Sequence, residues 1–293
     1  MLGHTEMRRS AMPCAMLVAA CITGLVAAAP AGATLRLAFP GGQEVAQPNS
    51  VASLTARCPA QAPHPIGAQF GALTRATLGA LALVESSPVG TRGWRITVLN
   101  MSAAPVGFGA AAVCLSAPGA RFAYPRMSEV AQPQSAVGYE ISCPSFAPVP
   151  IAATFALQAG SPPGAAVASW MVQGYTKQGR LSNFEFAGMR DLTNAPVGFY
   201  VGAVCSTLQI TNDVQESRGH VAAGSADGWW FQCPVGWLAV GGVFWDSTPR
   251  DAAQITLAGS WAFKTRKWEV VVRNLTTRTL HYGSGIVCLR QKR

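Results

Sequence analysis

Hydrophobic and polar residues alternate with a period of two in the clearest segments of the chain. In residues 94–100 (WRITVLN), Trp94, Ile96 and Val98 alternate with Arg95, Thr97 and Leu99, and residues 268–274 (WEVVVRN) repeat the pattern. Runs of this kind, rich in β-branched and aromatic residues and bounded by Gly, Pro, Asn and Ser, are typical of half-buried strands. No segment has the 3.6-residue period and capping residues of a helix. The pattern predicts an all-β protein.

The same strand patterns occur three times along the chain. Two long stretches align without a gap, LAFPGGQEVAQPNSVASLTARCP (37–59) and FAYPRMSEVAQPQSAVGYEISCP (122–144), and DGWWFQCP (227–234) repeats their end. Three further segments close the units: PVGFGAAAVC (105–114), PVGFYVGAVC (196–205) and LHYGSGIVC (280–288). Self-similarity at a fixed spacing indicates a repeat architecture. We expect three β repeats, at 34–118, 119–207 and 208–293.

Two arrangements of these repeats fit the sequence. The repeats follow one another as small packed β units, each with its own core, or they close around a pseudo-threefold axis as a β-prism-like assembly. The linkers are short and contain no Ser/Pro-rich or charged tract, which favours tight packing. The sequence gives a slight preference to tandem units.

Residues 1–33 have the features of a secretory signal peptide. Arg8 and Arg9 precede an apolar run from about Ala11 to Ala29, and Ala-Gly-Ala at 31–33 supplies the small residues of a cleavage site. A membrane anchor and lipidation at Cys21 are the alternatives. No later segment is long and apolar enough to span a bilayer. We therefore expect a secreted or periplasmic protein.

Six cysteines remain after residue 33, and an even number in an exported chain indicates disulfides. Six cysteines allow fifteen pairings, but each repeat opens with Cys-Pro and closes with Val-Cys. The repetition selects three pairs: Cys58–Cys114, Cys143–Cys205 and Cys233–Cys288. Closing a loop of roughly 60 residues stabilises a fold by about 4 kcal/mol in the chain-entropy model.

The third repeat carries a recognisable series of motifs: CPVGWLAVGGVF (233–244), STP (247–249), WEVVVRN (268–274) and GSGIVCL (283–289). It resembles an uncharacterised β repeat of secreted bacterial proteins, with Cys-Pro-x-Gly, a Gly-Gly strand, Ser-x-Pro, Trp-x-Val, Asn and a closing Val-Cys. That resemblance implies no activity and no site. The overall plan is also similar to that of vitelline-membrane outer-layer proteins, which are disulfide-linked threefold β-prisms. The second likeness concerns architecture only.

Composition and motifs argue against catalysis. Only 12% of residues are charged, the formal net charge is +9, and no common catalytic motif is present. His64, His220 and His281 occupy non-equivalent positions, and none has a partner at metal-ligand spacing. We expect no cofactor and no metal site. A weaker alternative is an extracellular glycan hydrolase that uses Asp246 or Asp251 as one of two carboxylates.

Asn100 and Asn274 head N-x-[ST] sequences at equivalent positions of two repeats. The Ala-rich composition is typical of a bacterial protein, in which such sequences do not signal glycans. We expect both side chains to end a strand and shape its turn, because Asn hydrogen-bonds readily to nearby backbone.

Comparison of equivalent positions separates structural residues from candidates for function. Trp268 matches Trp94, Trp261 matches Trp170, and Trp229 matches Leu54 and Tyr139, so these tryptophans are predicted to pack in the core. Trp230 replaces Thr55 and Glu140 at an outward position, Trp245 replaces Gly71 and Ala156, and Trp237 stands where the other repeats have alanine. Three extra tryptophans suggest a stacking platform, or alternatively the packing of an interface between repeats.

The third repeat is also the most basic, and its Lys264, Arg266 and Lys267 fall in a predicted hairpin turn. The candidate ligand-binding residues are therefore Trp230, Trp237, Trp245, Asp246, Lys264, Arg266 and Lys267. They predict a non-catalytic protein that recognises carbohydrate or an anionic cell-surface polymer through residues 208–293. A structural or cell-envelope interaction protein is the alternative. No nucleic-acid recognition motif is present, so we expect no nucleic-acid partner.

Overall fold

The computed structural model describes residues 35–175, 181–210, 217–246 and 254–290. Within these ranges the chain is all β apart from one short 3-10 turn. The predicted signal peptide, the alternative lipid anchor at Cys21, and Asp251 lie outside the described residues. In the part of the chain that is described, no helix has the length and hydropathy needed to cross a membrane.

Each predicted repeat contributes seven of the described strands. The first repeat contains β1 (Arg36–Ala38), β2 (Gly41–Ala46), β3 (Val51–Arg57), β4 (His64–Ala72), η1 (Arg75–Thr77), β5 (Leu81–Val89), β6 (Gly93–Asn100) and β7 (Val106–Ser116). The second contains β8 (Phe122–Ala123), β9 (Arg126–Ala131), β10 (Ala136–Ser142), β11 (Val149–Leu157), β12 (Ala166–Tyr175), β13 (Leu181–Asp191) and β14 (Val197–Ser206). The third contains β15 (Gln209–Ile210), β16 (Ser217–Val221), β17 (Ala226–Gln232), β18 (Leu238–Asp246), β19 (Ile255–Lys264), β20 (Lys267–Asn274) and β21 (Leu280–Arg290).

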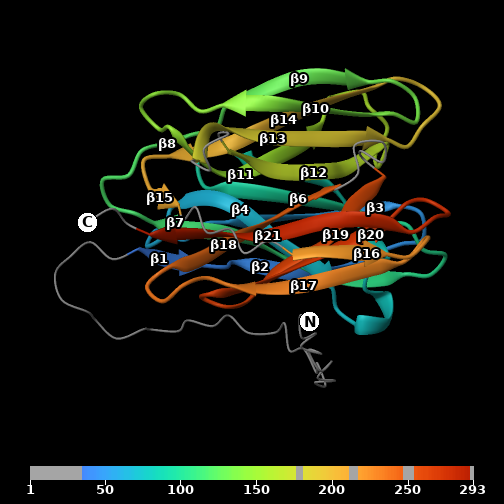
Figure 1. Ribbon diagram of the computed structural model, residues 1–293, viewed down its shortest axis with the longest axis horizontal. Coiled ribbons are helices and arrows are strands. Elements are labelled where there is room, and N and C mark those ends of the chain that lie inside the picture. The colour runs from blue at the N-terminus through green and yellow to red at the C-terminus, as the bar shows by residue number, and fades with distance from the viewer. Residues whose placement is uncertain (1–34, 176–180, 211–216, 247–253, 291–293) are drawn as a thin grey trace, which may run out of the picture.

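The strands form three antiparallel sheets, and every sheet is built from two repeats (Figure 1). In sheet A, strands β1, β2, β7 and β4 of the first repeat meet strands β19, β20 and β17 of the third. In sheet B, strands β8, β9, β14 and β11 of the second repeat meet β5, β6 and β3 of the first. In sheet C, strands β15, β16, β21 and β18 of the third repeat meet β12, β13 and β10 of the second. One pairing rule, applied cyclically, generates all three sheets.

The preference for tandem units is therefore wrong, because among the described strands no repeat has a sheet of its own. Each repeat divides its strands between two sheets, and the third repeat pairs with the first to close the ring. The two halves of each sheet are joined at one paired position, in which a buried phenylalanine faces the neighbouring repeat: Phe70 with Ser260, Phe155 with Ser86, and Phe244 with Met171. This closed arrangement is the pseudo-threefold alternative.

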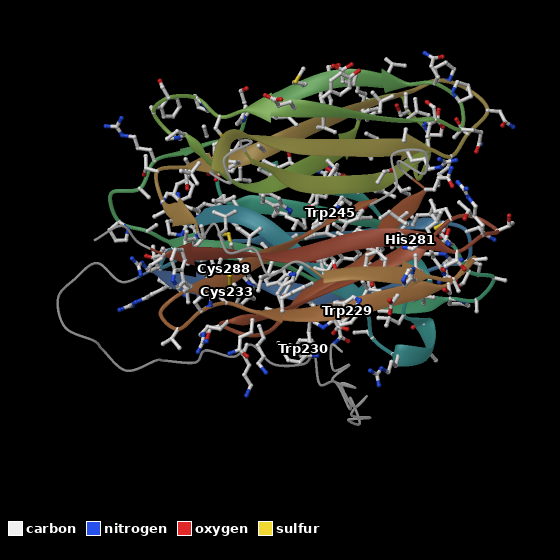
Figure 2. All side chains as sticks on the ribbon, in the orientation of Figure 1. Trp229, Trp230, Cys233, Trp245, His281 and Cys288 are labelled. Carbon is white, nitrogen blue, oxygen red and sulfur yellow. A yellow bond between two sulfur atoms is a disulfide. The ribbon has the colours of Figure 1, made fainter. Side chains whose placement is uncertain are left out.

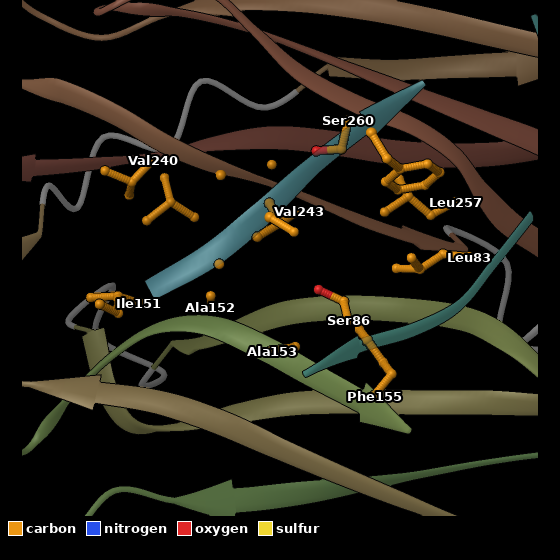
Figure 3. A pocket seen from close by; sticks show the side chains of 16 residues that line it. Leu83, Ser86, Ile151, Ala152, Ala153, Phe155, Val240, Val243, Leu257 and Ser260 are labelled. Carbon is orange, nitrogen blue, oxygen red and sulfur yellow. The ribbon is translucent and has the colours of Figure 1, made fainter. Parts of the chain in front are cut away.

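The centre of the ring is filled by small and branched apolar side chains. Equivalent β-bulges occur at Ile66, Ile151 and Val240, and all three side chains are buried. Ile151 and Val240 line a central cavity of about 30 Å³ together with residues from all three repeats (Figure 3). Gly242, the second glycine of the Gly-Gly motif, has no room for a side chain, because a Cβ there would lie 2.2 Å from the side chain of Val270. The core therefore requires close approach of strands from different sheets.

Two buried tryptophans have their polar atoms satisfied. The indole Nε1 of Trp94 donates to Ser86 Oγ at 3.0 Å, and that of Trp268 donates to Ser260 Oγ at 2.7 Å. Both tryptophans are fully buried, as their equivalence predicted. A buried indole N–H without an acceptor would be costly, so the serines allow large aromatic rings in the core.

The three predicted disulfides are confirmed: Cys58–Cys114, Cys143–Cys205 and Cys233–Cys288. In every pair the first cysteine directly follows a strand of one sheet and the second lies within a strand of another. The bonds consequently link sheet B to A, sheet C to B and sheet A to C. Each disulfide joins two faces of the closed ring.

Asn100 and Asn274 end strands and organise the turns that follow, as predicted. Both are fully buried, and the Oδ1 of Asn100 accepts hydrogen bonds from Ser102, as that of Asn274 does from Thr276. Asp191 occupies the same position in the second repeat, and its Oδ1 accepts from Thr193. These side chains act in the turn and are not surface acceptors for glycans.

Candidate functional site

Three side chains form a row across the outer face of sheet A. Trp230 of β17 is in register with Glu269 of β20, and Glu269 is in register with Trp261 of β19. Directly opposite residues of an antiparallel sheet point to the same side. Trp268 and Val270, which flank Glu269, are fully buried in the core, so the row faces outward. An acidic side chain thus lies between two tryptophans.

The rim of this surface is aromatic and basic. Trp230 is 60% exposed, and Lys267 Nζ lies 4.8 Å from the centroid of its ring, a cation–π contact. Lys264 is exposed and in register with Lys267 at the β19–β20 hairpin, as the sequence predicted. Phe263, in the same hairpin, is 42% exposed, with its ring centroid 6.3 Å from that of Trp261. We call Trp230, Trp261, Phe263, Lys267 and Glu269 the sheet A patch.

Glu269 is the partly buried member of the sheet A patch. Burial raises its pKa from 4.5 to about 7, and the positive charge of Arg75, in η1 of the first repeat, opposes this rise. The carboxyl group lies next to Gly228 of β17, where a Cβ would be in ordinary van der Waals contact with Glu269 Oε1 at 3.5 Å. Near neutral pH both protonation states are populated, so the carboxyl group is able to donate or to accept a hydrogen bond.

The residues at the equivalent row of the other two sheets differ from those of the sheet A patch. The equivalent rows, found from the strand register, are Thr55–Arg95–Ser87 in sheet B and Glu140–Phe186–Val172 in sheet C. In sheet B, Arg95 instead lies 3.9 Å from Glu85 in an ion pair. Because the core positions of the three repeats are alike, this difference marks the outer face of sheet A as specialised.

Trp261 belongs to the sheet A patch rather than to the core, which corrects its sequence alignment with Trp170. The register places Trp170 opposite Gly188, a position that corresponds to Gly259 and not to Trp261. The ring of Trp261 lies over glycines of two repeats, since a Cβ on Gly71 or Gly259 would lie within 3 Å of it. Its Nε1 is buried without a hydrogen-bond partner.

Trp229 was predicted to pack in the core, but it is 39% exposed. It lies on the inner side of β17, which is the edge strand of sheet A. There its indole hydrogen-bonds the hydroxyl of Tyr282 in sheet C. Trp229 therefore covers the junction between two sheets, and exposure at that edge leaves part of its ring in solvent.

Arg266 has a structural role that repeats in the first unit. Its Nε and Nη2 donate to the carbonyl oxygen of Cys233 at 3.1 and 2.8 Å. Arg92 donates in the same way to the carbonyl oxygen of Cys58. Since the contact occurs in a repeat without the aromatic patch, Arg266 is better explained as a brace between a hairpin and the Cys-Pro segment than as a ligand contact.

Trp237 lies in a turn away from the sheet A patch. Its backbone N–H donates to Pro234, as Ala62 and Ala147 do to their prolines, which confirms that Trp237 replaces alanine. The guanidinium carbon of Arg290 lies 4.9 Å from the centroid of its ring. The two side chains form a separate contact beside the Cys233–Cys288 disulfide.

Trp245 lies on sheet C, apart from Trp230 (Figure 2). It is partly buried and in register with Gly283, where a Cβ would lie 2.2 Å from its ring, so the ring lies flat on that glycine. Asp246 ends β18 opposite Tyr282, and its side chain lies outside the described set. A single platform of three tryptophans is therefore not formed.

Two histidines that have no partner at metal-ligand spacing along the sequence are neighbours in the fold. His220 of β16 is in register with His281 of β21, and their ring centroids are 4.2 Å apart. The two histidines are separated by 60 intervening residues, so an argument from sequence spacing does not detect the pair, whereas the strand register does.

Sequence reasoning found Trp230, Lys264 and Lys267 but missed Glu269, Trp261 and Phe263. Glu269 follows the inward Trp268 in an alternating strand, so the sequence already placed it outward. A comparison of outward positions across all three repeats would have found the row. No family model and no curated protein matches the chain.

Proposed function

We propose that the protein is a non-catalytic binding protein that recognises carbohydrate through the sheet A patch. The observation that supports this is the Trp230–Glu269–Trp261 row, which occurs on one of three otherwise equivalent sheets. Nothing in the packing of the fold requires a 60% exposed tryptophan at that position, because Thr55 occupies it in sheet B.

The chemistry of the sheet A patch suits a sugar. The apolar C–H face of a pyranose ring packs well on an exposed indole, and Trp230 offers such a face. Glu269, between the two tryptophans, is placed to hydrogen-bond sugar hydroxyls, and Lys267 supplies a charged donor beside it. Aromatic contact with a few convergent polar groups is the usual composition of a ligand site.

The shape of the surface favours a polymer over a small free sugar. The central cavity and a second hollow lined by Met101 and Arg190 contain no residue of the sheet A patch. A row of side chains across adjacent strands instead offers an open face along which an extended chain is able to lie. Lys264 and Lys267 at the β19–β20 hairpin, and Arg75 beside Glu269, favour glycans that carry negative charge.

The test is binding of the disulfide-bonded protein to an array of neutral and acidic polysaccharides, followed by titration calorimetry. We expect Trp230→Ala to weaken binding at least tenfold and Lys267→Ala to weaken binding of acidic glycans selectively. Phe146→Ala is the matched control, because Phe146 is an aromatic residue of the second repeat that is 50% exposed, close to the 60% of Trp230. Absence of binding, or equal affinities of the Trp230 and Phe146 variants, would refute the proposal.

A further inference from the structure

The His220–His281 pair is a second candidate site, on sheet C and independent of the sheet A patch. The two residues are directly opposite on adjacent antiparallel strands, so their side chains project to the same side. Both are exposed, their ring centroids lie 4.2 Å apart, and the ring planes meet at 68°. Two imidazoles are thus held together at the surface by a rigid backbone.

This spacing matches the requirement of a shared metal ion. Imidazole nitrogens bind transition metals at about 2 Å, so two nitrogens on one ion lie about 3 Å apart. Rings with centroids 4.2 Å apart reach that separation by small side-chain rotations. Because the strands fix both ligands in advance, the second nitrogen binds with a high effective concentration.

We propose that His220 and His281 form a two-histidine site for a divalent transition metal ion, with Cu²⁺ preferred over Ni²⁺ and Zn²⁺. Imidazole suits all three ions, and intrinsic affinity rises toward Cu²⁺. Among the described residues, no group of three or more His, Cys, Asp or Glu is positioned to hold a metal. Two protein ligands leave the remaining positions to water or to an outside ligand, which favours an ion that accepts open coordination sites.

Trp245 provides an optical reporter of the site. It lies flat on Gly283, two residues along β21 from His281, which corresponds to about 7 Å on the same face of a strand. Figure 2 shows both side chains in the same region of the molecule. Paramagnetic Cu²⁺ held by the histidines would quench this indole, whereas Zn²⁺ would not.

The experiment is a titration of the untagged, disulfide-bonded chain with Cu²⁺, followed by calorimetry and tryptophan fluorescence. We expect one tight Cu²⁺ site, quenching that Trp245→Phe reduces, and electron paramagnetic resonance splittings from two nitrogens. His220→Asn and His281→Asn should each weaken binding at least tenfold. His64→Asn is the control, because His64 stacks on Phe122, with a centroid distance of 4.5 Å, rather than on a second imidazole.

Thermal melting separates a binding defect from a folding defect. Both histidines are exposed, so their substitution should leave the melting temperature without metal unchanged, while Cu²⁺ should raise it only in chains that retain both. Unchanged Cu²⁺ affinity in either histidine variant, or an equal loss in the His64 variant, would overturn the proposal. Binding of Zn²⁺ more tightly than Cu²⁺ would overturn the assigned preference.

Discussion

Asp191 is a buried carboxylate in a position where the other two repeats use an amide. Asn100 Nδ2 donates to the carbonyl oxygens of Ala46 at 2.9 Å and Ala104 at 2.8 Å, and Asn274 Nδ2 makes the equivalent bonds in the third repeat. Asp191 is 0% exposed, and its Oδ2 has no hydrogen-bond partner. A carboxylate oxygen is unable to donate to the carbonyl groups that this turn presents. We predict that Asp191→Asn stabilises the protein.

The magnitude follows from the groups involved. Leaving a buried polar atom without a partner costs about 1–3 kcal/mol, and a new hydrogen bond to a carbonyl contributes about 1 kcal/mol. The change adds no volume, because Asn and Asp are nearly isosteric. We expect a gain of about 2 kcal/mol in the free energy of unfolding, which raises the melting temperature of a protein of this size by about 6 °C.

Denaturant titration and calorimetry of the oxidised protein measure this gain, with the reciprocal Asn100→Asp and Asn274→Asp changes as controls. Both controls should lower stability by a similar amount, because each replaces two or more donated hydrogen bonds with an unpaired oxygen. If Asp191→Asn is neutral or destabilising while the controls behave as expected, then Asp191 Oδ2 has a partner in solution and the reasoning from equivalence fails.

Two further predictions follow from the fold and the patch. Since burial raises the pKa of Glu269 from 4.5 to about 7, the native state holds a proton that the unfolded chain releases, and its stability falls as pH rises across that window. Glu269→Gln should remove this fall: after allowance for partial exposure, the free energy of unfolding of the variant should exceed that of the original protein by about 2 kcal/mol at pH 8 and equal it at pH 4. Denaturant titrations at several pH values measure the difference, and a difference that does not change with pH would contradict the prediction. Residues 208–293 expressed alone should show no cooperative thermal transition by circular dichroism, because β19 and β18 lose their partners in β4 and β12; a cooperative transition would contradict the strand exchange.

Some features of the fold were predictable because the sequence displays them directly, either as a pattern within one repeat or as similarity between repeats. Alternation gave the strands, and repetition selected the three disulfides among fifteen pairings. The turn role of Asn100 and Asn274 followed from their equivalence. All of these depend on short spacing or on similarity between repeats, which a sequence displays directly.

The exchange of strands between repeats was not predictable from the same information. A half-buried strand has the same alternation whether its neighbour belongs to its own repeat or to the next. The sharing of each sheet between two repeats is fixed by pairings such as Phe70 with Ser260, whose residues are distant in sequence. The His220–His281 pair and the true equivalent of Trp261 were missed for the same reason, since both depend on register across strands.

The closed ring also determines where the sheet A patch is able to exist. Trp261 of the third repeat rests on Gly71 of the first, and the Ala262 N–H donates to Gln69 Oε1 of the first at 2.9 Å. Arg75, from the first repeat again, supplies the charge beside Glu269. The inner positions of the three repeats are constrained alike by the shared core, whereas an outer row is free to diverge. The proposed binding surface on sheet A therefore depends on the assembled ring, and its third-repeat residues would lose their supporting contacts if the first repeat were removed.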